Sequence, residues 1–133
     1  MTDDIKKKID VVFIAGGKFH DIDFARLEIL KLLAEDDRMK VRVFEDYSNL
    51  HAIEKADFLI TYTCDVRPTL EQQRVLKDYV SSGNRWLALH GTNSILQFMS
   101  DGKVDSPRIA PVMMETLGSQ FIAHPPIEPY KVN

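Results

Sequence analysis

A continuous apolar run near the start of the chain, residues 11–15, constrains the fold more than any other feature. Its sequence is VVFIA, and it stops at the pair Gly16 and Gly17. A strand covered on one face alternates apolar and polar residues, whereas a strand covered on both faces is apolar throughout. The run therefore predicts the first strand of a sheet that is buried on both sides.

The rest of the chain alternates strand and helix patterns. Apolar or alternating runs predict three more strands over residues 40–44, 56–61 and 85–90. Strands separated by helical segments favour a mostly parallel sheet with helices on both faces. The predicted class is α/β, and at 133 residues the chain fits one domain.

Helical periodicity and capping residues define the helices. Acidic residues precede a predicted helix over residues 22–35, which is expected to bury Phe24, Leu27, Leu30 and Leu33. A Thr-x-x-Gln capping box at Thr69 predicts the start of another helix, and Gly83 is placed to end it. Two shorter helices are expected, one around Ile95, Leu96 and Phe98 and one over residues 111–117 closed by Gly118, with a loop over residues 100–108 between them.

Composition narrows the function classes. Hydrophobic residues make up 44% and charged residues 28%, and the mean hydropathy is −0.20 with no long uncharged apolar run, so no membrane span is expected. The formal net charge of −3 gives no reason to expect nucleic-acid binding. The single cysteine and the absence of a signal-like start predict a cytoplasmic location.

Histidines follow two of the predicted strands. His20 comes shortly after the first strand, and His90 ends the last one and is followed by Gly-Thr. Ligands of parallel α/β sheets bind beyond the carboxyl ends of the strands, and imidazole can act there as acid, base, nucleophile or metal ligand. Both residues are candidate catalytic groups, although a solvated His20 and a hydrogen-bonded, structural His90 fit the local sequence as well.

The glycines and the cysteine carry weaker signals. Gly16 and Gly17 could bring backbone amides close to a ligand, but a complete nucleotide-binding pattern is missing and a tight turn that requires glycine is the favoured explanation. Cys64 has a carboxylate neighbour, Asp65, which would raise the pKa of the thiol. Cys64 is therefore interpreted as structural.

Four segments together resemble the ThuA-like (trehalose utilisation) family of the class I glutamine amidotransferase-like superfamily. They span nearly the whole chain and read VVFIAGGKFH at residues 11–20, TYTC at 61–64, LHGT at 89–92 and LGSQFIAHP at 117–125. The resemblance implies a three-layer flavodoxin-like fold and a carbohydrate or related small polar ligand. His90 stands where amidotransferases carry a cysteine nucleophile, so glutamine hydrolysis is not expected. Residues 1–133 would form one domain that lacks the C-terminal part of the family's full domain.

Two functional hypotheses follow. In the first, an enzyme or sugar-processing domain gathers His20, His90 and His124 around one crevice, with Thr92 and Asn93 bonding ligand hydroxyls, and the three imidazoles could hold Zn²⁺. In the second, the chain is a non-catalytic binding or assembly module, for which a homo-oligomer is one option. A flavin carrier is less well supported, because no phosphate-binding run of Ser and Thr follows the first strand.

Overall fold

The main sheet has four parallel strands in the order β2-β1-β3-β4. The computed structural model describes residues 7–124, 126 and 128–132. The strands are β1 (Ile9–Gly17), β2 (Met39–Phe44), β3 (Phe58–Cys64) and β4 (Arg85–Ala88), and helices α1 (Ile22–Leu33), α2 (Leu50–Lys55) and α3 (Leu70–Ser81) connect them in turn. The predicted α/β class is confirmed.

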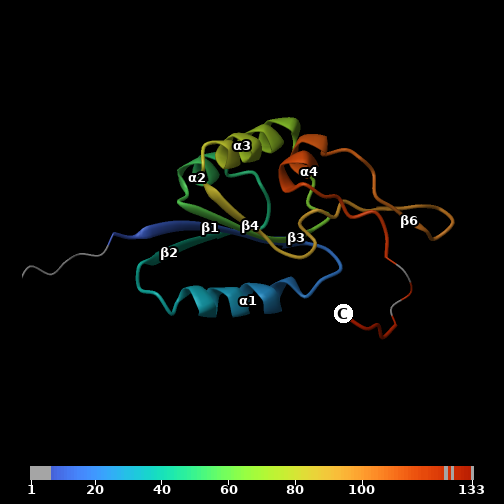
Figure 1. Ribbon diagram of the computed structural model, residues 1–133, viewed down its shortest axis with the longest axis horizontal. Coiled ribbons are helices and arrows are strands. Elements are labelled where there is room, and N and C mark those ends of the chain that lie inside the picture. Colours follow the sequence, from blue (N-terminus) through green and yellow to red (C-terminus); the bar gives the residue numbers. More distant parts are fainter. Residues whose placement is uncertain (1–6, 125, 127, 133) are drawn as a thin grey trace, which may run out of the picture.

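Helices lie on both sides of the sheet (Figure 1). One side carries α1, and the other carries α2, α3 and α4 (Pro111–Leu117). Successive side chains of a strand point to opposite faces, so the run at residues 11–15 supplies both cores. Val11 and Phe13 pack in the cluster on the α1 side, and Val12 and Ile14 in the cluster under α2 to α4. All five residues of the run have no exposed surface, as the sequence predicts.

Sequence reasoning does not predict α2, and three of its expectations about local structure are wrong. The helix expected around Ile95 does not form. Instead, β5 (Gln97–Phe98) pairs antiparallel with β6 (Val104–Asp105), a strand that lies within the expected loop. In α1, Phe24 and Leu27 are 62% and 52% exposed, because the inward stripe of this helix centres on Ala25 rather than on them.

The described helices are all short. α1 and α3, each 12 residues long, are the longest of them. In the described residues, none of the helices has both the length and the apolar composition that crossing a membrane requires. α4 ends at Gly118 in the left-handed conformation, as its sequence predicts.

The start of α3 provides a first prediction. Thr69 accepts a hydrogen bond from the Gln72 amide, and the Gln72 side chain accepts one from the Thr69 amide, which forms the predicted capping box. Truncating the Thr69 side chain to a methyl group removes the hydroxyl and leaves a helix amide without this partner, so Thr69→Ala should lower the unfolding free energy by about 1 kcal/mol. Urea denaturation measures the loss. Thr69→Ser, which keeps the hydroxyl, is the control and should stay close to wild type.

Candidate functional site

The order of the strands marks one place on the sheet. β2 lies on one side of β1 and β3 lies on the other, so the direction of strand addition reverses between β1 and β3. Open α/β sheets bind ligands at such a switch point, beyond the carboxyl ends of the strands. Here the two strands end side by side, with Gly17 paired to Cys64. The segments that follow β1, β3 and β4 can supply side chains to this edge.

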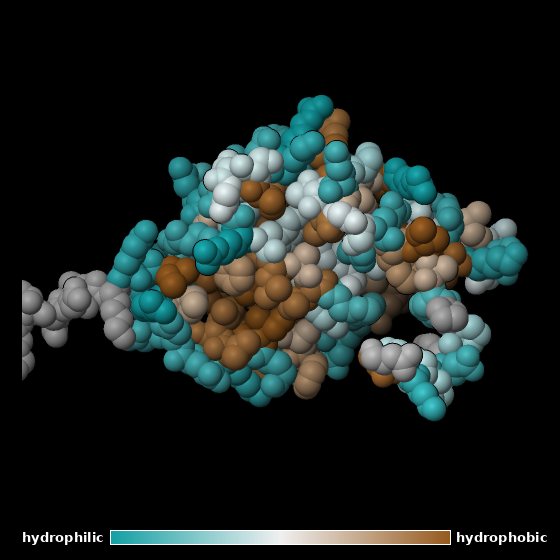
Figure 2. All heavy atoms as spheres, viewed as in Figure 1, coloured by the Kyte–Doolittle hydropathy of each residue, from teal (hydrophilic) through white to brown (hydrophobic). Residues whose placement is uncertain are grey.

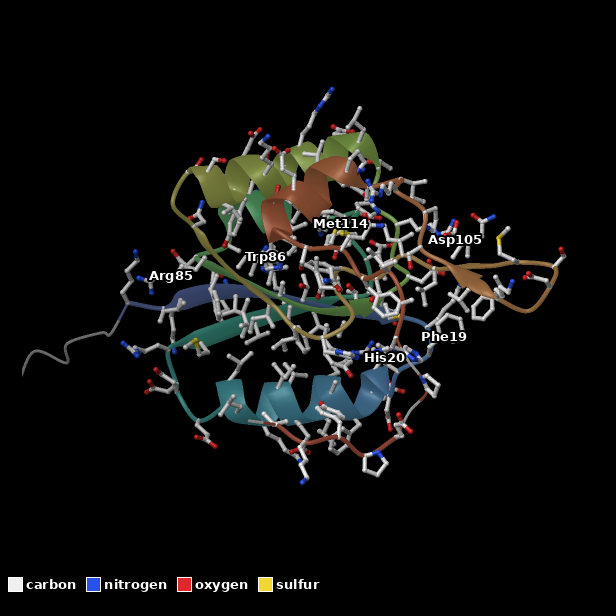
Figure 3. All side chains as sticks on the ribbon, turned by 45° about the vertical axis from the view of Figure 1, so that its right-hand side comes forward. Phe19, His20, Arg85, Trp86, Asp105 and Met114 are labelled. Carbon is white, nitrogen blue, oxygen red and sulfur yellow. The ribbon has the colours of Figure 1, made fainter. Side chains whose placement is uncertain are left out.

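His20 and His90 lie together at this edge. Their ring centroids are 4.9 Å apart, and the rings are inclined by 32°. His20 also meets the ring of Tyr62 edge to face at 6.0 Å. Figure 3 shows His20 near the start of α1. The structure thus brings together two imidazoles that are far apart in the sequence. The Nδ1 atom of His20 is buried and has no hydrogen-bond partner among the described residues.

His124 does not complete a metal centre with them. Its side chain is exposed, and its ring lies 6.1 Å from that of Phe121. Across the described part of the chain, no group of three His, Cys, Asp or Glu side chains is placed to hold a metal ion. The structure therefore does not assemble the predicted set of His20, His90 and His124, and zinc binding stays a prediction.

Three glycines at this edge are needed for close packing of the backbone. A Cβ on Gly16 would lie 2.0 Å from the carbonyl oxygen of Glu45, and one on Gly17 would lie 1.9 Å from that of Cys64. A Cβ on Gly91 would lie 2.4 Å from the carbonyl oxygen of Thr63. Gly16 and Gly17 are the last residues of β1 and pair with β3, so they do not form a separate phosphate-binding loop. The first role of the three glycines is to let β1 and the turn after β4 come close to the neighbouring backbone at Glu45, Cys64 and Thr63.

Asp65 links the segments that follow β1, β3 and β4, a role that sequence reasoning missed. Its side chain is 3% exposed, lies 3.0 Å from Lys18 Nζ and 3.1 Å from Arg67 Nε, and accepts a hydrogen bond from the Leu96 amide. Burial would raise the pKa of Asp65, but the bonds from Leu96, Lys18 and Arg67 hold it below its ordinary value. The only signal in the sequence was an acidic residue directly after a buried strand.

The predicted hydroxyl ligand Thr92 has an internal partner. Its side chain is buried, and its Oγ1 lies 2.9 Å from Thr61 Oγ1, which also accepts a hydrogen bond from the indole of Trp86. Thr92 therefore ties the segment after β4 to β3. Asn93 is more accessible and donates to the hydroxyl of Ser119 at 3.0 Å, which joins the segment after α4 to the site.

Two hollows flank the histidine pair and differ in charge. The hollow beside His90 has a volume of about 300 Å³ and no charged side chain in its lining, which consists of Ala88, Leu89, His90, Gly91, Thr92, Asn93, Leu117 and Ser119. The hollow beside His20 has about 320 Å³ and is lined by Gly16, Gly17, His20, Asp21, Ile22, Asp23, Arg26 and Glu45. The first hollow offers neutral polar groups, and the second is charged.

Cys64 is not equipped to act as a nucleophile. Its side chain is buried, and the pKa of the thiol is raised by burial and, to a smaller extent, by the charge of Asp65. The thiolate, which is the reactive form, is therefore disfavoured. The structural interpretation of Cys64 agrees with this environment.

Comparisons of the chain with protein-family models, with curated proteins and with solved structures found no match. The ThuA-like resemblance therefore rests on the sequence segments alone. What the site does has to be argued from its geometry.

Proposed function

We propose that the chain binds a neutral, hydroxyl-rich small molecule, a carbohydrate or a related polyol, at the C-terminal edge of its main sheet. The observation that carries the proposal is the pairing of His20 and His90, 4.9 Å apart, where the strand order reverses. This edge is where open α/β sheets bind ligands. The ligand would lie against the imidazoles and extend into the hollow beside His90.

The lining of that hollow supports a neutral ligand. Its polar side chains are the imidazole of His90, the amide of Asn93, the hydroxyl of Ser119 and the internally bonded hydroxyl of Thr92. Such groups both donate and accept hydrogen bonds, as sugar hydroxyls do. A volume of about 300 Å³ suits a small molecule. Unlike the hollow beside His20, it contains no charged group that would select an ion.

Proton transfer is the chemistry that the histidines could add. A neutral imidazole carries one donor and one acceptor, and histidine is the most common general acid or base near neutral pH. His90 would be the catalytic residue and His20 its partner, as proposed from the sequence. The buried Cys64 thiol supports the expectation that glutamine is not a substrate.

The proposal extends to the fold family. We take the arrangement to be three-layered and flavodoxin-like, as in ThuA-like proteins, because the strand order β2-β1-β3-β4 begins the order 2-1-3-4-5 of that fold. Helices on both sides of the sheet agree with this assignment (Figure 1). Three of the four resembling segments lie in the main sheet or at its C-terminal edge, and Ser119 and Phe121 of the fourth bond to Asn93 at that edge.

A non-catalytic binding or assembly module is the second candidate. The observation that favours it is the exposure of β4, an edge strand on which Leu87 and Ala88 are both exposed. Apolar edge strands are typical sites for association with another chain. In the first candidate His90 takes part in a reaction, whereas in the second it contributes to binding at most.

Isothermal titration calorimetry with trehalose, glucose and sorbitol tests the proposed site. We expect at least one of these probes to bind wild-type protein, and His90→Ala to abolish that binding. The matched control is His51→Ala. His51 is an exposed histidine on α2, and α2 packs on the core cluster at the side of the sheet opposite α1. Loss of binding in both variants, or in neither, would contradict the assignment.

A further inference from the structure

The side of β4 that faces α1 is uncovered. In the register of the sheet, Leu87 pairs with Ile60 and Arg85 pairs with Phe58, and paired residues of neighbouring strands point to the same face. Ile60 and Phe58 belong to the cluster on the α1 side, so Leu87 and Arg85 also face that side. Leu87 is nevertheless 45% exposed. Figure 2 shows apolar side chains gathered in a hollow between the main sheet and α1.

α1 carries an apolar ridge on its outer side. Phe24 and Leu27 are 62% and 52% exposed, and residues three positions apart are neighbours on a helix surface. A helix that covers a sheet at the surface normally turns polar residues outward. The exposed pair therefore offers a partner an apolar contact surface on α1.

The charges around these two surfaces are complementary. At the start of β4 the hollow is lined by three basic residues, Lys7, Lys8 and Arg85, and by one acidic residue, Asp57. The end of α1 is followed by acidic residues, of which Glu35 and Asp37 are exposed. Because α1 runs back from the end of β1 to the start of β2, its acidic end lies at the same level of the sheet as the start of β4.

We propose that the hollow binds α1 of a second copy of this chain, in a symmetric dimer whose two main sheets enclose both α1 helices. A two-fold axis parallel to the strands places α1 of the second copy under β4 and points its Phe24 and Leu27 at Leu87. The same rotation brings its acidic end to Arg85. The contact is reciprocal, since each copy offers one helix and one hollow, as a two-fold interface requires.

Sedimentation equilibrium over a range of protein concentrations tests the proposal. Wild-type protein should form a dimer. Leu27→Glu places a charge on the apolar ridge and should raise the dissociation constant at least about tenfold. Leu70→Glu is the matched control, because Leu70 is 49% exposed but starts α3 on the other side of the sheet. Circular dichroism verifies that the variants are folded.

A charge exchange tests the orientation of the two copies. Arg85→Glu and Glu35→Lys should each weaken the dimer, and the double variant should restore it because the attraction is re-formed with reversed signs. A wild-type protein that stays monomeric at the highest concentration would overturn the proposal. A dimer that Leu27→Glu and both charge reversals leave unchanged would overturn it equally.

Discussion

Gly17→Ala is expected to lower the unfolding free energy by at least about 4 kcal/mol, enough to prevent folding of a marginal domain. Gly17 has a φ of 105°, and an added Cβ would lie 1.9 Å from the carbonyl oxygen of Cys64. That oxygen also accepts a hydrogen bond from the Lys18 amide, so it cannot withdraw without breaking the contact between β1 and β3. Urea denaturation, or the yield of folded protein, measures the effect.

Gly102→Ala is the matched control for this prediction. Gly102 also has a positive φ, of 81°, but an added Cβ would meet nothing within 4 Å. Its replacement should cost only about 1 kcal/mol, the usual penalty for alanine in a left-handed conformation. The difference between the two variants therefore isolates the clash with Cys64. Equal losses would show that β1 and β3 do not approach as closely as described.

Asp65→Ala should lower the unfolding free energy by about 3 kcal/mol at neutral pH, because a buried carboxylate with three partners is lost. The Leu96 amide would keep no acceptor, and Lys18 and Arg67 would lose the anion that holds them. Asp65 has a φ of 57°, which alanine tolerates poorly. Asp65→Asn keeps a side-chain oxygen and tolerates this backbone conformation, so it should lower the unfolding free energy by about half as much.

The same carboxylate predicts how stability depends on pH. The pKa of Asp65 is lower in the folded chain than its ordinary value of 3.8. The contribution of its charge is therefore fully present above pH 3.8 and is lost as the pH falls through the lowered folded pKa. The stability difference between wild type and Asp65→Asn should be constant near neutral pH and shrink under acid. A difference that grows under acid would contradict the assigned contacts.

Elements with a strong period or a continuous apolar run could be predicted from the sequence. The run at residues 11–15 identified β1, and Thr69 with Gln72 identified the start of α3. α2 was missed because its six residues are too few to show a helical period. The apolar residues around Ile95 predict a helix, but tertiary contacts determine the structure of this segment: Ile95 is in the core, while Phe98 is 59% exposed in a hairpin.

The site was predictable only in part. Parallel strands end at one edge of a sheet, so the positions of His20 and His90 after two strands were enough to expect them at the same edge. Their separation could not be predicted, because it depends on the turns at Gly17 and Gly91. Nor could the internal bonding of Thr92, because a hydroxyl that binds a ligand and one that ties two segments look alike in a sequence.

The most direct test of the central claim is a carbohydrate titration that follows the imidazole Cε1–H signals of the isotope-labelled protein by NMR. Trehalose, glucose and sorbitol serve as the probes. The proposal predicts that at least one of them shifts the signals of His20 and His90 together, with one dissociation constant, while the signal of His51 stays in place. Signals of His20 and His90 that do not move with any probe, or that move no more than that of His51, would contradict a ligand site at the histidine pair.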